Sequence, residues 1–197
     1  PTRGLDLPTP KDPRRPVCSD ELLAKMLKEA PNVTRRVRGD GENEQARTCL
    51  RELLLVAAGT GARIGSILRL RWSDWDPDAA TWGTLRWRGE HQKNAETRVT
   101  PVPESVREAL TEHRRRSPGV AEAPIWPAPD SEGHLRVDTA LAWLQEAEKE
   151  ARGHHRKGFG WHALRRRWAN KMKGRSPVDV ARLGGWSGPQ VMEQVYQ

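Results

Sequence analysis

Residues 161–172 read WHALRRRWANKM, and this stretch decides how the second half of the chain folds. Its apolar side chains recur at helical spacing, which predicts a helix with one face in a core. They are Trp161, Leu164, Trp168 and Met172. His162 and Arg165, three residues apart, project from one flank of that face. We therefore expect this pair at the wall of a cleft, with the other polar side chains of the helix pointing further out. Those are Arg166, Arg167 and Asn170.

The same stretch lies inside a long basic block. From Arg152 to Arg175 the chain has nine Lys and Arg residues and no Asp or Glu. A solvated helix face normally mixes both signs, as residues 145–150 do. The unmixed block therefore predicts a surface that faces phosphate groups. We expect six of its side chains to contact the backbone of double-stranded DNA: Arg152, Arg156, Lys157, Arg166, Arg167 and Lys171.

Composition agrees with a polyanionic partner. The 197 residues include 34 Lys and Arg against 26 Asp and Glu, a formal net charge of +8. Cys18 and Cys49 lack the spacing of a metal site, so we expect reduced thiols, no metal and no other cofactor. The chain has no secretory signal and no apolar run of membrane-spanning length, which predicts a cytoplasmic protein without a membrane partner.

Periodicity and turn residues predict one α+β domain, mostly α-helical, over residues 17–197. Residues 1–16 are rich in Pro and basic residues and indicate an extended arm. The predicted helices cover about 19–31, 44–58, 63–70, 103–116, 137–152, 161–173, 177–184 and 189–196. Residues 72–76, 81–88 and 97–102 predict a small three-stranded antiparallel sheet. Residues 32–44 are polar and contain glycine, so we expect a loop there.

Three further segments contain candidate site residues. Residues 59–74 read GTGARIGSILRLRWSD, and the glycines place Arg63 at a helix start, where it can face an anion. The polar loop 89–96 contains His91 and Lys93, although a lysine on such a tip is ordinarily only solvated. A Leu-Gly-Gly-Trp turn ends at Trp186, whose indole N–H can donate to a phosphate oxygen. Tyr196, ten residues later, is the single tyrosine of the chain.

In order and spacing, these segments resemble the catalytic domain of tyrosine recombinases, the phage integrase family. The resemblance runs over residues 17–197 and rests on Thr-Gly-x-Arg with Leu-x-Trp-x-Asp, Arg-x-x-Pro, His-x-x-Arg and Leu-Gly-x-Trp followed by Tyr. It implies six active-site residues: Arg63, Lys93, His162, Arg165, Trp186 and Tyr196. The register of the Arg-x-x-Pro strand selects Lys93 over His91. Ser66 departs from the pattern, because the family usually has an acidic residue there.

The resemblance also implies the chemistry. Arg63 and Arg165 would hold the phosphate, His162 would act as base or phosphate ligand, and Lys93 would protonate the leaving 5′-oxygen. Tyr196 would form a 3′-phosphotyrosyl intermediate without metal or ATP, during integration or excision at DNA attachment sites.

Full-length relatives carry an N-terminal core-binding domain and assemble as a synaptic tetramer. We expect a catalytic fragment without that domain, monomeric by itself, in which the last turn before Tyr196 frays easily.

Two alternative functions remain open, and a third is less well supported. A type IB topoisomerase shares the chemistry, and a catalytically inactive DNA-binding module could share the fold. A metal-dependent nuclease is disfavoured because the histidines show no ligand pattern with carboxylates. They are His91, His154, His155 and His162.

Overall fold

The computed structural model describes residues 15–38, 43–91, 95–129 and 132–196. The arm expected at residues 1–16 therefore lies almost wholly outside the described residues. The α-helices are α1 (Asp20–Glu29), α2 (Leu50–Thr60), α3 (Ile64–Leu68), α4 (Glu104–Arg116), α5 (Val137–Arg152), α6 (Trp161–Lys171), α7 (Pro177–Gly184) and α8 (Pro189–Tyr196). The strands are β1 (Thr34–Arg38), β2 (Asn43–Arg47), β3 (Trp75–Asp76), β4 (Thr84–Trp87) and β5 (Arg98–Pro101). The chain is thus mostly helical with a small antiparallel sheet, as predicted.

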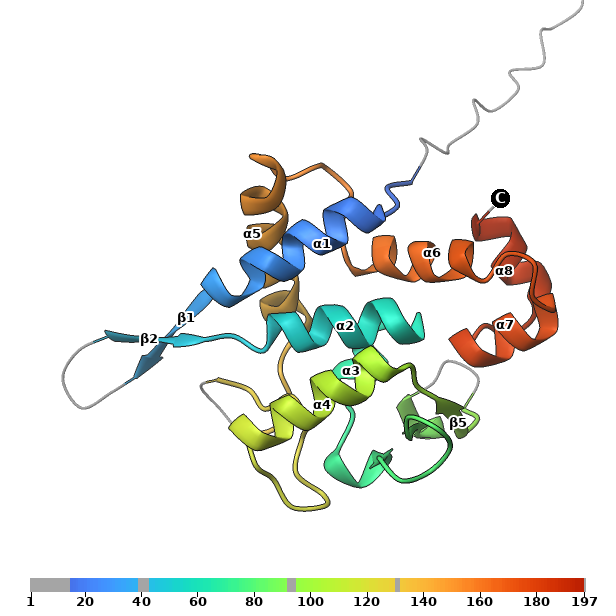
Figure 1. The fold of residues 1–197 in the computed structure, drawn as a ribbon, viewed down its shortest axis with the longest axis horizontal. Coiled ribbons are helices and arrows are strands. Elements are labelled where there is room, and N and C mark those ends of the chain that lie inside the picture. The colour runs from blue at the N-terminus through green and yellow to red at the C-terminus, as the bar shows by residue number, and fades with distance from the viewer. Residues whose placement is uncertain (1–14, 39–42, 92–94, 130–131, 197) are drawn as a thin grey trace, which may run out of the picture.

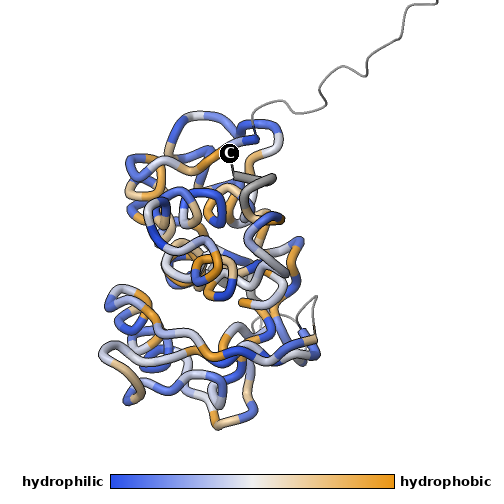
Figure 2. Tube along the Cα trace, turned by 90° about the vertical axis from the view of Figure 1, so that its right-hand side faces the viewer, coloured by the Kyte–Doolittle hydropathy of each residue, from blue (hydrophilic) through white to orange (hydrophobic). Residues whose placement is uncertain are grey.

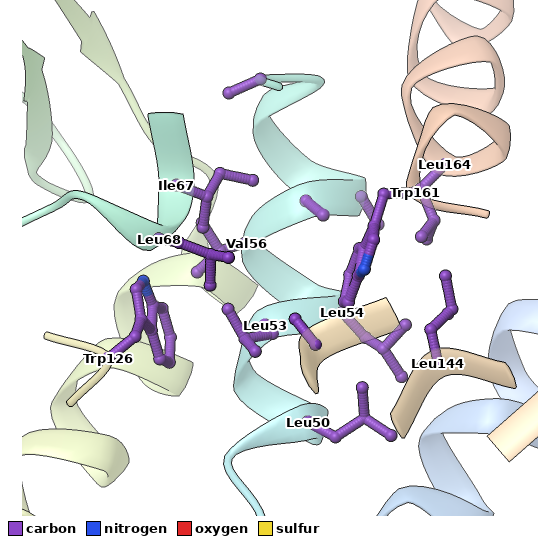
Figure 3. Close-up of a cluster of buried hydrophobic side chains, with 14 of the residues drawn as sticks. Leu50, Leu53, Leu54, Val56, Ile67, Leu68, Trp126, Leu144, Trp161 and Leu164 are labelled. Carbon is purple, nitrogen blue, oxygen red and sulfur yellow. The ribbon is translucent and has the colours of Figure 1, made fainter. Parts of the chain in front are cut away.

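Helix α2 runs through the middle of the molecule (Figure 1). Its apolar side chains pack on two sides, as Figure 3 shows. Leu53 and Val56 lie towards Ile67, Leu68 and Trp126. Leu54 lies on the other side, with Leu144, Trp161 and Leu164. This two-sided burial packs α3, which Arg63 directly precedes, and α6, which contains Arg165, against one rigid core.

Strands β3, β4 and β5 form the predicted three-stranded antiparallel sheet, in that order. Trp87 pairs with Arg98 across β4 and β5. The Trp87 ring is buried, and its Nε1 donates to Thr100 Oγ1 at 2.8 Å. Arg98 therefore begins β5 at a position fixed by the sheet register.

The predicted loop at residues 32–44 is wrong. Strands β1 and β2 form an antiparallel hairpin in which Thr34 pairs with Arg47 and Arg38 pairs with Asn43. The hairpin projects at the end of the molecule away from α7 and α8 (Figure 1). The two strands pair through backbone hydrogen bonds, which do not depend on side chains. A polar sequence without alternating apolar residues can therefore form this hairpin. For the same reason α2 begins at Leu50, later than the predicted residue 44.

The predicted start of α1 is confirmed. Ser19 caps α1, accepting a hydrogen bond from Leu22 N at 3.1 Å. Cys18 and Cys49 are free thiols, and burial raises the pKa of each to about 12. Hydrophobic and hydrophilic stretches alternate along the trace (Figure 2). Within the described residues, no helix is both long and apolar enough to span a membrane.

Candidate active site

The last two residues of α7 and the two residues after them, 183–186, form the turn at the centre of the site. Gly185 ends α7 in the left-handed conformation, with φ of 71°. Trp186 follows and is buried, with its ring centre 6.0 Å from that of Trp168 on α6. A Cβ on Gly184 would lie 1.7 Å from the Trp186 ring. The paired glycines are therefore required for the indole to fold back over its own turn.

Arg165 connects this turn to the core. Its side chain is only 3% exposed, and Nη1 donates to Gly184 O at 2.6 Å and also to Gly61 O, at the end of α2. The guanidinium carbon lies 3.5 Å from the centre of the Trp186 ring. Such a cation–π contact holds the arginine and the indole in one relative orientation.

Arg63 reaches the same turn from another element. It is the N-cap residue of α3, half-buried, and its Nη1 donates to Gly185 O at 2.9 Å. Ser66, where the family pattern has an acidic residue, is buried, and its Oγ donates to His91 O at 3.4 Å. Ser66 therefore contacts the segment that leads into the Lys93 loop.

His162 lies in the first turn of α6 and is exposed. Desolvation by the surrounding protein lowers its pKa, and the positive charges of Arg165, Arg166 and Arg63 lower the pKa further. The imidazole is therefore neutral at pH 7, the form that can accept a proton.

Two predicted site residues are not placed. Lys93 lies outside the described residues, between η3 (Gly89–His91), a short 3₁₀ helix, and β5. Tyr196 ends α8, which follows directly from the turn, but only its backbone is described. The structure therefore brings Arg63, Arg165 and Trp186 together at one turn, with His162 three residues before Arg165 on α6. The catalytic roles of all six residues stay predictions.

Sequence reasoning missed Arg98, the first residue of β5. Its Nη1 donates to Leu183 O, and to Arg182 O at 3.5 Å. Arg98 is the arginine of the Arg-x-x-Pro pattern. From the sequence, that pattern serves only to select Lys93 over His91, and it does not predict that Arg98 itself lies at the site. Nothing in the local sequence indicates that its guanidinium reaches a turn 85 residues away.

The six predicted DNA-contacting residues fall into two groups. Arg156 and Lys157 are exposed, whereas the other four have partners within the chain. Those contacts are Arg152 with Glu148 at 3.4 Å, Arg166 Nε with Pro16 O at 2.7 Å, Arg167 with Asp20 at 2.7 Å and Lys171 with Asp20 at 2.8 Å.

The expectation that Arg166 points outward is wrong. Its side chain is 8% exposed, because the segment before α1 packs along this flank of α6. Residues 152–175 contain no Asp or Glu, but Asp20 of α1 forms ion pairs with Arg167 and Lys171 of this block.

Among the described residues, no group of three His, Cys, Asp or Glu side chains could hold a metal ion.

Several solved structures share this fold. XerA recombinase matches with a TM-score of 0.70 and 19% identity, over 95% of this chain and 61% of that one. The Tn1549 transposon integrase in complex with transposon right end DNA matches with 0.73 and 14%, over 97% and 64%. A lambda integrase dimer bound to a core site matches with 0.68 and 18%, over 95% and 49%. The chain thus spans less than two thirds of each of these proteins.

No curated protein matches the sequence. The sequence model described as "Phage integrase family", however, matches residues 32–197, most of the chain. That range includes Arg63, His162, Arg165, Trp186 and Tyr196, and the structure gathers Arg63, Arg165 and Trp186 around one turn. The chain belongs to the phage integrase family.

Proposed function

We propose that the protein is a site-specific DNA recombinase, in which Tyr196 attacks a DNA phosphodiester and forms a 3′-phosphotyrosyl intermediate. The observation that carries the proposal is the convergence on one turn of Arg63 and Arg165, which lie 122 and 19 residues from their carbonyl partners. Two guanidinium groups beside the helix that ends in the single tyrosine are what phosphoryl transfer to a phenol needs.

The arginines would neutralise charge at the reacting phosphate. In the transition state both non-bridging oxygens carry negative charge, and preorganised donors stabilise it most where water is excluded. Arg165 is already held by the core and by Trp186, so little reorganisation is needed when DNA arrives. A guanidinium has five N–H donors, so Arg63 can bind the turn and a phosphate oxygen together.

His162, Lys93 and Tyr196 would move the protons. A neutral His162 can accept the phenolic proton or donate a hydrogen bond to the phosphate. The cationic cluster would lower the pKa of Tyr196 from its ordinary value near ~10. Lys93 would protonate the departing 5′-oxygen, leaving a 5′-hydroxyl that later attacks the phosphotyrosine and rejoins the strand.

We further propose that residues 17–197 form the catalytic domain and that double-stranded DNA is the partner. Structures of a Tn1549 transposon integrase and of a lambda integrase in complex with DNA support this choice. Arg156 and Lys157, exposed in the described structure, are the first candidates for backbone contacts. The same proposal includes a chain that is monomeric by itself and that assembles as a synaptic tetramer on DNA.

A suicide-substrate experiment tests the proposed function. The protein is mixed at low salt with a pool of 5′-labelled nicked duplexes whose central sequence is random. Because of the nick, cleavage releases a short strand on the 3′ side of the break, which diffuses away and traps the covalent intermediate. We expect a labelled covalent protein–DNA adduct on a denaturing gel, and its sequenced DNA should report site preference. Absence of an adduct with the wild-type chain, or its persistence in Tyr196→Phe, contradicts the proposal.

A further inference from the structure

Arg98 is an arginine at the site for which the chemistry above has no role. It lies at the start of β5, half-buried, with its guanidinium carbon 5.0 Å from the centre of the Trp87 ring on the neighbouring strand. Trp87 is fully buried and fixed by its bond to Thr100. The sheet therefore presents Arg98 from a rigid platform.

The guanidinium also touches the turn. A Cβ built on Gly185 would lie 2.8 Å from Nη2 and 3.0 Å from Cζ of Arg98. Nη1 donates to Leu183 O, while Nε is buried and has no hydrogen-bond partner among the described residues. Arg98 thus contacts both an indole and the backbone of the Gly184-Gly185 turn.

Keeping this cation at the site costs free energy. Burial, and then the positive charge of Arg63, lower the pKa of Arg98 to about 10. A charge removed from water is retained only when compensating contacts stabilise it. The hydrogen bonds of Arg98 within the described residues are those to carbonyls of α7 and the turn, so this segment supplies the compensation.

Three consecutive carbonyls of the segment accept from three separate elements. Leu183 O accepts from Arg98 on β5, Gly184 O from Arg165 on α6, and Gly185 O from Arg63 before α3. Loss of one anchor would leave the turn held from two sides only, and would allow Trp186 and the start of α8 to shift.

We propose that Arg98 is a positioning residue, which holds the Leu183–Gly185 turn so that Trp186 and α8 stay in register with Arg63 and Arg165. Its effect on strand cleavage rests on the proposed function, whereas its effect on the turn does not. A misplacement of about 1 Å in a reacting group can cost about 100-fold in rate, so a mobile turn should slow cleavage strongly.

The test compares Arg98→Met, which keeps the stem but removes the guanidinium, with Arg114→Met as a matched control. Arg114 also lies over a tryptophan, with its guanidinium carbon 5.4 Å from the Trp72 ring, but on α4 and away from the turn. Hydrogen exchange of residues 183–192 is measured without DNA, and the rate of adduct formation is measured with the nicked duplex pool.

For Arg98→Met we expect faster exchange in residues 183–192, unchanged exchange in α2, and adduct formation slower by about 10- to 100-fold. Arg114→Met should match the wild type in both measurements. Arg98→Lys provides a second variant, because it keeps the positive charge beside Trp87 but cannot keep the planar guanidinium contacts with the turn; it should reproduce both changes even if Arg98→Met does not fold.

Each other outcome overturns the proposal. Wild-type exchange in the turn shows that Arg98 does not hold it. Slower cleavage with unchanged exchange assigns Arg98 to direct DNA contact, and faster exchange with unchanged cleavage shows that the turn's position does not matter. If the wild-type chain itself forms no adduct, the proposed function fails, while the exchange result still decides whether Arg98 holds the turn.

Discussion

The two apolar clusters of the protein differ in size and in what they hold. The large one surrounds α2 and includes side chains from α1 to α6. The small one has five buried residues, Trp168, Ala169, Val180, Ala181 and Trp186, with Met172, Leu183 and Met192 packed against it. Arg63 and His162 are placed by elements of the large core, whereas the turn and the start of α8 depend on the small cluster.

This difference indicates that the two clusters hold different parts of the site. The large core fixes the groups that would bind a phosphate. A few apolar contacts, and hydrogen bonds from three arginines to backbone carbonyls, hold the segment that leads to Tyr196, the proposed nucleophile. Segments with few buried contacts open at lower free energy than the core does. We therefore expect the C-terminal segment to move separately, with Arg165 as its strongest link to the core.

The largest effect should come from breaking that link with Arg165→Lys. Lysine keeps the charge but loses the bonds to Gly61 and Gly184 in their planar geometry and the stacking on Trp186. Adduct formation on the nicked duplex should fall by about 10²–10³-fold, the usual loss for one transition-state donor. Arg115→Lys, on the exposed face of α4, is the control and should react like the wild type.

The contrast between the clusters can be tested with two leucines. Leu53→Ala, in the fully buried centre of the large core, should lower the free energy of unfolding by about 2–5 kcal/mol. Leu183→Ala, at the edge of the small cluster, should lower it less and should speed hydrogen exchange only around residues 183–192. Equal losses in denaturant unfolding would show that the two clusters form one cooperative unit.

A smaller effect concerns pH. Because the pKa of His162 lies below its ordinary 6.5, the neutral base persists as pH falls to that value. The rate of adduct formation should therefore stay above half of its plateau at pH 6.5 and decline only at lower pH. The acid limb should disappear in His162→Asn at a much reduced rate. A midpoint at or above pH 6.5 would contradict the assignment of His162 as base.

The smallest effect should come from the exposed basic residues. Arg156→Ala and Lys157→Ala should each weaken DNA binding modestly and reduce the slope of log affinity against log salt by about 1. Fluorescence anisotropy with a labelled duplex at several salt concentrations measures this. Arg115→Ala provides the control; unchanged slopes for both test variants would remove them from the DNA interface.

Much of the fold could be predicted from the sequence, because most helices have strong periodicity and clear boundaries. The predicted bounds of α5 and α7 agree with the structure, and Ser19 caps α1 as expected. The hairpin at residues 34–47 was missed because two strands that pair mainly with each other leave no apolar alternation. Local sequence patterns predict a strand from apolar alternation, and residues 34–47 have none.

The site could be predicted only in part, for a related reason. His162 and Arg165 are three residues apart on one helix, so their proximity follows from helical geometry. The contact of Arg98 with Leu183 and the burial of Arg166 against Pro16 join segments far apart in sequence. Such contacts depend on tertiary packing, and no local pattern predicts them.

The most direct test of the account is to locate the covalent bond. After reaction with a nicked duplex, trypsin and nuclease digestion should release the peptide 183–197, which has no internal Lys or Arg, for mass spectrometry. We predict that this peptide carries a nucleotide on Tyr196, linked through its 3′-phosphate, and that the mass shift is absent in Tyr196→Phe. An unmodified peptide, or a nucleotide attached to any other residue, would contradict the account.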